Sequence, residues 1–503
     1  LEVFIVKEYD IIIIGGGVVG CMTARFLSQY QLDILLIEKE ADIGSATSSA
    51  NSAVMHAGYD ALPGTLKAKT NAISSPLWDQ ISRELGFDFS RCGDYVVAVS
   101  DEQLETLQKL KQQGIDNGIK EISLITAKQM REHEPMISEN VTGALYVPSG
   151  GILDTFAVTV AAAENAVMNG VDLLLETPFL DFTMDGKKIV GVHTPKGDFK
   201  GRWVINAAGL YADEVMHKAN VQPEFYIRPR RGEYVILDKV DYNLSRQTVL
   251  FPTPTDKGKG ILVASTLHGN TLIGPNSNFV ETKNDKTFTK EGFDEIWEGA
   301  LKLIPNLNRR HIIASFSGLR AHGNAPCLTP GVDYISDFII EIAEGVEGLI
   351  NLAGIESPGL TSSPGIALMV IDLLKEAGES LTPKANWNPI RPARPVFRHL
   401  SMPERKALVD KDPHYGRVIC RCETVTEGEI LAEIHAPIPA ITYDAIKRRT
   451  WTGTGRCQGG FDMPRVVKIL SDELNLPPEK ITKKGSDSPF LYRRTKDLEE
   501  VES

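Results

Sequence analysis

The sequence contains no run of about 18 apolar residues, so it offers no candidate for a membrane-spanning helix, although attachment at a membrane surface is not excluded. Cysteine is scarce, with six in 503 residues, which excludes a disulfide framework and favours a reduced, cytoplasmic setting. Positive charge is also in short supply, because 54 Lys and Arg face 66 Asp and Glu. The resulting net charge of -12 disfavours a nucleic-acid partner but leaves room for a small anionic substrate, which needs only a few local cations. Glu2, Lys7 and Glu8 interrupt the first apolar stretch, so we expect no signal peptide.

The length allows roughly two to four domains of ordinary size. Prolines at positions 383, 389, 392 and 395 crowd into one stretch, where they exclude a regular helix or a central strand. We therefore expect a proline-rich linker over 383–410 and a small separate domain over 411–503. The region 1–382 mixes strand and helix signals, which predicts an α/β and α+β fold with a nucleotide-binding domain interleaved with a mixed-sheet substrate domain. The expected nucleotide-binding segments are about 8–80, 150–220 and 335–382, and the expected substrate domain covers about 81–149 and 221–334.

The first element signals of the chain are those of a Rossmann-like βαβ unit. Tyr9–Ile14 is a β-branched apolar run, Val18–Tyr30 has helical character, and Ile34–Ile37 is a second apolar run. Together they span about 30 residues, the usual size of such a unit. The turn between the first strand and the helix is therefore expected at the carboxyl end of a parallel sheet.

That turn carries a dinucleotide-binding fingerprint, Gly15-x-Gly17-x-x-Gly20. Gly15 permits the tight turn, Gly17 lets the backbone approach a pyrophosphate, and Gly20 allows the helix to pack closely on the strand. The following helix start offers N–H groups to phosphate charge. Glu38 ends the second strand, where a carboxylate accepts hydrogen bonds from ribose hydroxyls.

Two further small-residue segments follow strand signals, at Asn206–Gly209 and Asn351–Gly354. Small residues there let each segment lie close to the first glycine turn. Several segments that lie close together suit a long cofactor that stays enclosed better than a nicotinamide cofactor, which must bind and be released. The sequence therefore favours FAD over NAD.

Several motifs now resemble those of the D-amino-acid-oxidase-like flavoprotein superfamily over about residues 9–380. Within it, the sequence most resembles the type II FAD-dependent glycerol-3-phosphate dehydrogenase/oxidase group, with L-2-hydroxyglutarate dehydrogenases as near relatives. The motifs that carry the resemblance are the glycine turn with Glu38, Ser49-Ala50-Asn51-Ser52-x-Val54-x-His56, Asn206–Gly209, Gly318-Leu319-Arg320 and Ser357-Pro358-Gly359-Leu360-Thr361.

The resemblance implies roles for five side chains at a substrate site. His56 is the candidate to hold or accept the hydroxyl proton of a secondary alcohol, because its ordinary pKa lies near the working pH, and Ser52 adds a hydroxyl on the same side. Arg320 would hold an anion with its guanidinium fork, Lys259 would add a second cation, and Ser357 would reach the substrate. The alternative readings are a histidine that packs on the flavin, an arginine in a structural ion pair, and a solvated hairpin lysine.

The same resemblance implies a set of cofactor-binding residues, drawn from the strand ends and from the start of a later helix. The resemblance also covers a motif at Arg231–Tyr234, to which we assign an architectural role rather than a role in binding FAD. The expected FAD-binding residues are Gly15, Gly17, Val19, Gly20, Glu38, Ser49, Ala50, Val54, Gly209, Gly354, Gly359, Leu360 and Thr361.

The activity implied is oxidation of sn-glycerol 3-phosphate to dihydroxyacetone phosphate by hydride transfer to flavin. Two alternatives remain open. One is a dehydrogenase of the L-2-hydroxyglutarate type, whose substrate carries a carboxylate where the first carries a phosphate. The other is a flavin-bearing electron-transfer subunit that has no substrate of its own.

The last part of the chain contains three cysteines on two loops, each loop leading into a helix signal. Cys420 and Cys422 precede a capping box at Thr426-x-x-Glu429, and Cys457 lies in a glycine-rich loop before a helix that starts near Pro464. This tail resembles the bacterioferritin-associated-ferredoxin-like [2Fe-2S] domain, whose pattern expects a fourth cysteine where this chain has Asp462.

An aspartate at that position leaves three readings open. They are a [2Fe-2S] cluster with mixed ligands, a zinc site of three cysteines and one aspartate, and a domain without a metal. If the tail holds a cluster, electrons are expected to leave through it toward a partner subunit or a quinone pool. The setting expected for such a protein is the cytoplasm or the inner face of the membrane.

Overall fold

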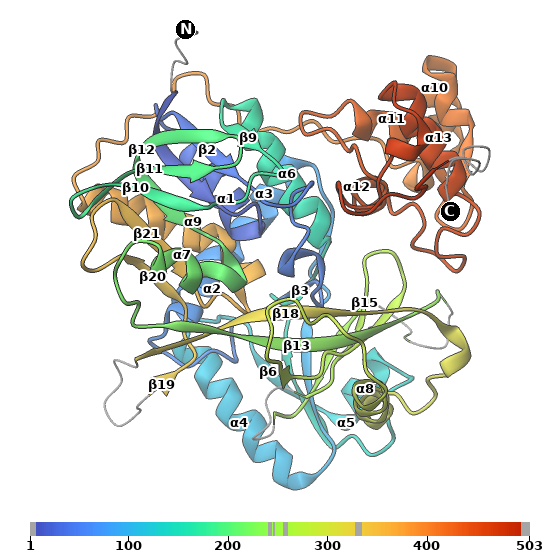
Figure 1. Cartoon of the computed structure of the whole chain (residues 1–503). Helices are drawn as coiled ribbons and strands as arrows, with labels where there is room; N and C mark the ends of the chain where they lie inside the picture. Colours follow the sequence, from blue (N-terminus) through green and yellow to red (C-terminus); the bar gives the residue numbers. More distant parts are fainter. Residues whose placement is uncertain (1–6, 240–243, 245–246, 255–259, 327–333, 494–503) are drawn as a thin grey trace, which may run out of the picture.

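The computed structural model describes residues 7–239, 244, 247–254, 260–326 and 334–493 (Figure 1). Lys259, one of the expected substrate-binding residues, lies outside the described residues. Within the described part, one sheet carries the glycine turn, a second sheet packs beside it, and a small helical domain follows at the carboxyl end of the chain. The predicted fold class, a nucleotide-binding α/β domain combined with a mixed-sheet domain and a small α-rich tail, is confirmed.

The first sheet contains the predicted βαβ unit. Its central strands are parallel, and an antiparallel hairpin extends one edge. The path through the sheet runs β10 (Asp181–Asp185), β11 (Lys188–Thr194), β12 (Gly197–Asn206), β1 (Glu8–Ile14), β2 (Ile34–Ile37) and β9 (Asp172–Leu174), with β21 (Leu349–Ala353) on β12 and β20 (Ile339–Ile342) on β21.

The register of this sheet brings the sequence motifs to one edge. Ile14 pairs with Asn206 and with Ile37, and Asn206 pairs in turn with Asn351. Because the strands are parallel, the segments that follow these residues all leave from the carboxyl edge. The glycine turn, Glu38 and the two small-residue segments therefore lie together, although up to about 340 residues separate them in sequence.

Three long helices cover the first sheet, and their apolar faces form its core. The glycine-turn helix α1 (Val18–Leu27) packs between α6 (Thr155–Met168) and α9 (Gly359–Glu376). This α1 ends at Leu27, three residues before the end expected from the sequence. The short helix α7 (Ala212–His217) packs on the other face, against β21.

The second sheet is mixed and supplies the wall opposite the glycine turn. Its two longest strands, β13 (Tyr226–Leu237) and β18 (Ile312–Pro326), pair over most of their length and cross the middle of the molecule in Figure 1. The remaining strands, in order from β13, are β16 (Thr271–Ile273), β15 (Val263–Ser265), β14 (Val249–Pro252), β5 (Asp94–Ala98), β7 (Gly143–Val147) and β6 (Ser123–Thr126), with β19 (Tyr334–Ile335) on β18 and β17 (Asn278–Phe279) on β13. Helices α4 (Asp101–Asp116), α5 (Ala127–His133) and α8 (Lys290–Leu303) flank this sheet.

A small three-stranded sheet connects the two parts. It consists of β3 (Val54–Met55), β8 (Gly151–Leu153) and β4 (Phe89–Ser90), and helices α2 (Leu66–Ser74) and α3 (Trp78–Leu85) lie nearby. Ile81, Leu85 and Phe87 pack into the core of the nucleotide-binding part. By packing, this part therefore extends beyond residue 80, where the sequence analysis set its boundary.

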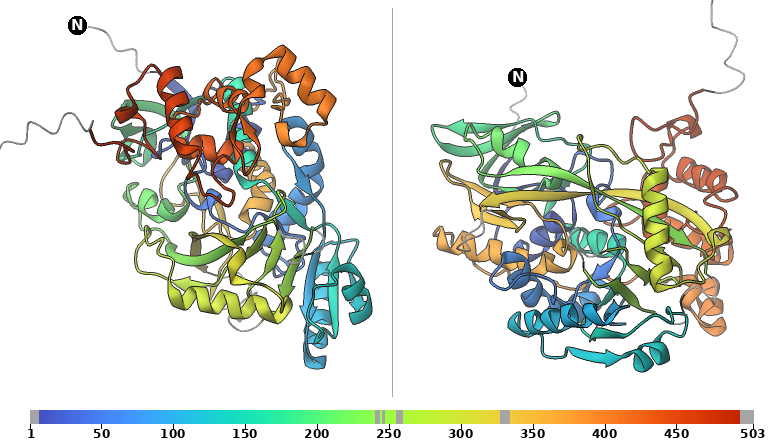
Figure 2. Two further views of the ribbon diagram at one scale, coloured as in Figure 1. Left: turned by 90° about the vertical axis from the view of Figure 1, so that its right-hand side faces the viewer. Right: turned by 90° about the horizontal axis from the view of Figure 1, so that it is seen from below.

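The tail is a compact helical unit with its own apolar core. It comprises α10 (Met402–Lys411), the hairpin β22 (Val418–Cys420) and β23 (Val425–Thr426), α11 (Glu427–Ile434), α12 (Tyr443–Thr450) and α13 (Met463–Glu473). Helix α10 takes up the last part of the segment expected as a linker and ends one residue beyond it, at Lys411. Pro403 occupies its first turn, where proline is tolerated, and a capping box of Ser401 and Glu404 starts it. Both views of Figure 2 keep the tail on one side of the molecule, and α12 contacts α6.

None of the described helices combines the length and the apolar character that crossing a bilayer requires.

Candidate functional site

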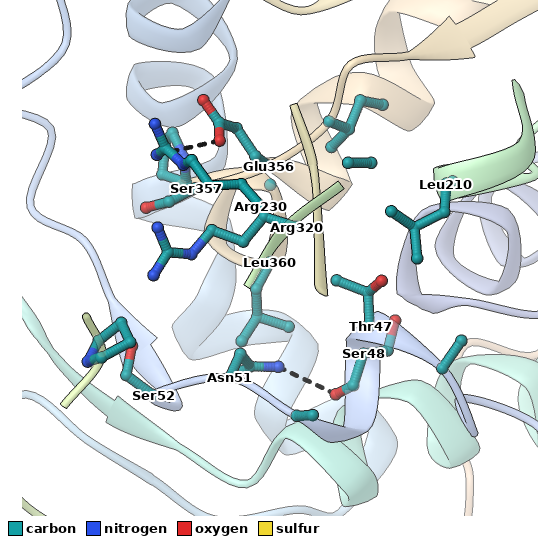
Figure 3. A pocket seen from close by; sticks show the side chains of 18 of the residues that line it. Thr47, Ser48, Asn51, Ser52, Leu210, Arg230, Arg320, Glu356, Ser357 and Leu360 are labelled. Atoms are coloured by element: carbon teal, nitrogen blue, oxygen red, sulfur yellow. Dashed lines mark hydrogen bonds and ion pairs between the residues drawn. The ribbon is translucent and has the colours of Figure 1, made fainter. Parts of the chain in front are cut away.

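A cavity of about 1300 Å³ lies between the carboxyl edge of the first sheet and the face of the second sheet (Figure 3). It is larger than an ordinary small-ligand pocket, which suits a long dinucleotide together with a substrate. Many of the expected site residues line it: His56, Ser52, Arg320, Ser357, Gly15, Gly17, Val19, Glu38, Ala50, Val54, Gly209, Gly359 and Leu360.

Four expected cofactor residues do not line the cavity, and each has a supporting contact instead. The Ser49 hydroxyl donates to the Ala46 carbonyl, and Gly354 lies with positive φ against Gly323. Thr361 is fully buried behind His56, whose backbone N–H donates to the Thr361 hydroxyl at 2.9 Å. The fourth residue, Gly20, packs in the glycine turn itself.

The glycine turn has the close contacts that its sequence predicts. A Cβ on Gly20 would lie 2.0 Å from the Gly15 carbonyl oxygen, and a Cβ on Gly15 would lie 2.5 Å from the Ala207 carbonyl oxygen. Gly15 also has φ of +111°, which favours glycine. Gly17 caps α1 without a side chain, and the first turn holds no acidic residue, so the positive end of the helix dipole is available to a phosphate.

Glu38 extends from the end of β2 to the same turn. Its carboxylate accepts hydrogen bonds from the backbone N–H of Gly16 at 2.6 Å and of Glu40 at 2.8 Å. Burial raises the pKa of this carboxyl above its usual value, and the two N–H groups partly oppose that effect. A carboxylate fixed in this way lies where it can accept from a sugar hydroxyl.

His56 follows β3 and is held by two neighbours from the start of α9. Its Nε2 lies 3.0 Å from the Ser357 hydroxyl, and its backbone N–H is bound by Thr361. The imidazole also lies near the ring of Phe251, at 6.0 Å between centroids. Ser357 therefore contacts the histidine directly, a role that the sequence analysis did not assign to it.

Two guanidinium groups reach the cavity from paired strands. Arg230 on β13 and Arg320 on β18 are direct register partners, and both line the cavity (Figure 3). Arg230 lies 3.2 Å from the carboxylate of Glu356, whereas the described partners of Arg320 are oxygens without charge, on Asn276, Ser277 and Tyr234. In the described part of the chain, no carboxylate lies within ion-pair distance of Arg320. The positive charge of Arg320 on this wall of the cavity therefore has no negative side chain beside it among these residues.

Glu356 is the centre of a buried polar cluster that sequence reasoning missed. Its carboxylate contacts Lys67 at 3.0 Å, the Ser336 hydroxyl at 2.8 Å and the His322 ring at 3.2 Å, in addition to Arg230. Burial alone would raise the pKa of Glu356, but the hydrogen bond with His322 and the charges of Lys67 and Arg230 hold it well below its usual range. No spacing signal could have found this cluster, because its members come from α2, β13, β18, the segment after β19 and the turn before α9.

The tail brings its three cysteines and Asp462 into one region. Cys422 and Cys457 are hydrogen-bonding neighbours, and Cys420 faces Asp462. Burial, together with the nearby Asp462, raises the pKa of the Cys420 thiol to about 12. Over the described residues, no three His, Cys, Asp or Glu side chains surround a single point as ligands of one metal ion would. The pair Cys422 and Cys457 and the pair Cys420 and Asp462 instead suit a group with two metal atoms, in which each pair would bind one atom.

Buried ion pairs dock the tail on the nucleotide-binding part. Asp42, in the loop after β2, accepts hydrogen bonds from Arg448 and Arg449 of the tail at 2.6 to 2.9 Å. Arg394 bridges Glu164 of α6 to Glu433 of α11. The tail is therefore attached by specific charge pairs as well as by the connecting segment.

The family model described as FAD dependent oxidoreductase matches residues 10–373. The chain belongs to this family. A second model, described as BFD-like [2Fe-2S] binding domain, matches residues 418–471 in the tail.

One relative matches nearly the whole chain, and two others match about three quarters of it. The glycerol 3-phosphate dehydrogenase of Caloramator mitchellensis is 45% identical and covers 97% of this chain and 99% of its own. The glycerol 3-phosphate oxidase of Mycoplasma genitalium is 34% identical over 76% of this chain and 98% of its own. Among solved structures, the dithionite-reduced L-α-glycerophosphate oxidase of Mycoplasma pneumoniae, with FAD bound, has a TM-score of 0.70 at 31% identity and covers 77% of this chain and 99% of its own.

The site fits FAD, the cofactor of the family. The start of α1, where Gly17 has no side chain and the Ser48 hydroxyl accepts from the Val18 N–H, would receive a pyrophosphate, and Glu38 would receive a ribose; His56 lines the same cavity. The protein is therefore an FAD-dependent oxidoreductase, as the sequence analysis predicted.

Proposed function

We propose that this protein oxidises sn-glycerol 3-phosphate to dihydroxyacetone phosphate. One observation carries the proposal: the guanidinium of Arg320, which has no carboxylate within ion-pair distance among the described residues, lines the same cavity as His56 and the glycine turn. The relatives named glycerol 3-phosphate dehydrogenase and oxidase support the choice of substrate.

Arg320 anchors the anionic end of the substrate. The Asn276 carbonyl, 2.8 Å away, and the Ser277 hydroxyl, 3.4 Å away, orient its guanidinium without neutralising it. A guanidinium fork binds phosphate through two parallel hydrogen bonds. Arg230 lies beside it, and like charges on paired strands repel, so an anion bound between them relieves that repulsion. Burial, together with the charge of Arg320, lowers the pKa of Arg230, while Glu356 acts in the opposite sense.

His56 receives the proton of the reacting hydroxyl. Oxidation of the secondary alcohol removes a hydride from the carbon and a proton from the oxygen, leaving a ketone. FAD, when bound, accepts the hydride. The imidazole Nε2 of His56, which lies 3.0 Å from the Ser357 hydroxyl in this structure, takes the proton once the substrate hydroxyl replaces Ser357 as its hydrogen-bond partner. Ser52, on the same wall, adds a hydroxyl to the substrate site.

We further propose that electrons leave through the tail rather than to oxygen. The three cysteines, on loops that lead into α11 and α13, hold a [2Fe-2S] cluster, and the acceptor is a partner subunit or a quinone. The match of the tail to a [2Fe-2S] binding domain and its docking by buried ion pairs support this route. The free cysteines of the described residues fit a cytoplasmic protein, and a quinone acceptor would bring it to the inner face of the membrane.

Anaerobic mixing of the FAD-loaded protein with candidate substrates tests the proposed activity. We expect glycerol 3-phosphate to bleach the flavin absorbance rapidly, and glycerol, which lacks the anion, to bleach it far more slowly. The variant Arg320→Met should lose most of the preference for the phosphate ester. Arg228→Met is the matched control, because Arg228 lies on β13 but is exposed and stacks on Phe279 outside the cavity.

The same experiment separates the alternatives. Bleaching by L-2-hydroxyglutarate in preference to glycerol 3-phosphate would replace the proposed substrate with a 2-hydroxy acid. Failure of every anionic 2-hydroxy compound to bleach the flavin would contradict the enzyme and favour an electron-transfer subunit.

A further inference from the structure

Asp462 is a buried carboxylate without a conventional partner. It is 1% exposed, and neither carboxylate oxygen has a hydrogen-bond donor in normal geometry among the described residues, although the Cys420 thiol lies close enough to interact with it. Asp462 is also the N-cap residue of α13, a position where aspartate ordinarily accepts from the first N–H groups of the helix. It makes no such bond, and its backbone has helical angles, with φ of -98° and ψ of -27°. The side chain of Asp462 therefore does not cap α13.

The groups nearest to Asp462 are the thiol of Cys420 and the hydroxyl of Tyr443. The carboxylate faces Cys420, which is 1% exposed at the end of β22, and Tyr443 of α12 lies close by. Lys447, also on α12, lies within electrostatic range but forms no ion pair with it among the described residues. Burying a carboxylate without an ion-pair partner costs free energy, and a bound cation would offset that cost.

The two cysteine loops are pressed together beside this carboxylate. A Cβ on Gly455 would lie 2.4 Å from the Cβ of Cys422, and a Cβ on Gly453 would lie 2.4 Å from the Tyr443 hydroxyl. Cys422 and Cys457 form one neighbouring pair, and Cys420 and Asp462 form another. The glycines thus permit an approach that larger residues would block.

We propose that Asp462 is the fourth protein ligand of a [2Fe-2S] cluster, with Cys420, Cys422 and Cys457 as the other three. This rests on the proposal that the tail holds a cluster and is independent of the substrate. A [2Fe-2S] group usually takes four thiolates, so three thiolates and one carboxylate form a mixed set. A carboxylate oxygen is a harder donor than a thiolate, so the two irons of this cluster differ in ligation.

Metal content and Mössbauer spectra of the full-length protein, purified anaerobically with its FAD, test this ligand set. We expect two irons and two sulfides per chain, and two distinct iron signals in the oxidised protein. Asp462→Ala should lose most of its iron. Asp462→Cys should keep both irons, make their signals more alike and shift the visible absorption bands. Asp472→Ala is the control, because Asp472 lies on the same helix α13 in an exposed pair with Lys468.

Each other outcome would overturn the assignment. Full iron content with an unchanged spectrum in Asp462→Ala would exclude the carboxylate as a ligand. Zinc without iron in the wild-type protein would indicate a zinc site, and a wild-type tail without metal would indicate a docking domain only. If Asp462→Ala fails to fold, Asp462→Cys still tests whether the carboxylate is a ligand. Mössbauer and absorption spectra of Asp462→Cys that equal those of the wild type would contradict ligation by oxygen. Flavin bleaching by glycerol 3-phosphate, measured on the same preparations, reports separately on the proposed function.

Discussion

Removal of the Asp42 carboxylate tests how firmly the tail is docked. We consider Asp42→Asn, which keeps the size of the side chain and removes its charge. The wild-type carboxylate accepts from Arg448 at 2.6 Å and from two nitrogens of Arg449 at 2.9 and 2.7 Å. The side chains of Asp42 and Arg449 are only 3% and 2% exposed, so solvent does not screen this pair.

The size of the effect follows from that burial. Breaking a buried ion pair on one side costs about 3–5 kcal/mol, because the remaining charge stays buried. Arg449 keeps a carboxylate of Glu433 at 3.7 Å and the Ala445 carbonyl at 3.2 Å, which points to the lower end of the range. A cost of about 3 kcal/mol corresponds to about a 150-fold increase in the population with the tail undocked.

Limited proteolysis of the connecting segment measures that population, because cleavage tracks the open fraction when opening is fast. We expect Asp42→Asn to be cleaved between the two parts about 100-fold faster than the wild type. Asp472→Asn serves as the control, since its exposed pair contributes little. Equal cleavage rates for Asp42→Asn and Asp472→Asn would refute the view that this ion pair holds the tail.

The pH dependence of the cleavage rate provides a second check on the role of Asp42. Burial would raise the pKa of Asp42, but the charges and hydrogen bonds of Arg449 and Arg448 outweigh it, so the folded pKa lies below the ordinary value. A carboxyl with a lowered folded pKa stabilises the docked state fully above its unfolded pKa of about 3.9 and loses that contribution as pH falls through the folded pKa. The difference between wild type and Asp42→Asn should therefore shrink below about pH 4, and a constant difference would contradict the assignment.

Three further changes test the cofactor and substrate site. His56→Gln should lower kcat about 100-fold or more with unchanged FAD content, because it removes the proton acceptor, and near-normal turnover would contradict that role. Arg320→Lys keeps the charge and loses the fork, so kcat/KM for glycerol 3-phosphate should fall about 10- to 100-fold, mainly through KM; an unchanged KM would place the anion elsewhere. Gly20→Ala puts a Cβ 2.0 Å from the Gly15 carbonyl oxygen and should lower the ratio of bound flavin to protein, read from the absorption spectrum. Full flavin content in this variant would show that the turn tolerates the added methyl group.

The local features of this fold could be read from the sequence because each depends on residues close together in the chain. The glycine turn requires a strand, a turn and a helix within about 30 residues, and the register of Ile14 with Ile37 confirms that unit. The capping box of Thr426 and Glu429 is likewise present as predicted. Such short-range patterns carry their own steric and hydrogen-bonding requirements.

The polar cluster around Glu356 could not be read in this way. Glu356 lies next to Ser357, which the sequence analysis did identify, but its partners Lys67, Arg230 and His322 come from three distant elements. Nothing in the spacing of these residues distinguishes them from solvated surface charges. Only the pairing of β13 with β18 and the packing of α2 bring them together, and that pairing depends on the whole second sheet.

The docking contacts also bear on how electrons would travel. Glu423, next to Cys422, pairs with Lys239 of the substrate part, and Arg456, next to Cys457, pairs with Asp238. The two loops that carry the cysteines are thus attached to the end of β13, the strand that also carries Arg230. A tail tethered only by its connecting segment would present a cluster to the flavin by diffusion. Here, the substrate part holds the cysteine loops and the nucleotide-binding part holds α12, so the position of the cysteines relative to the cofactor cavity is a property of the folded chain.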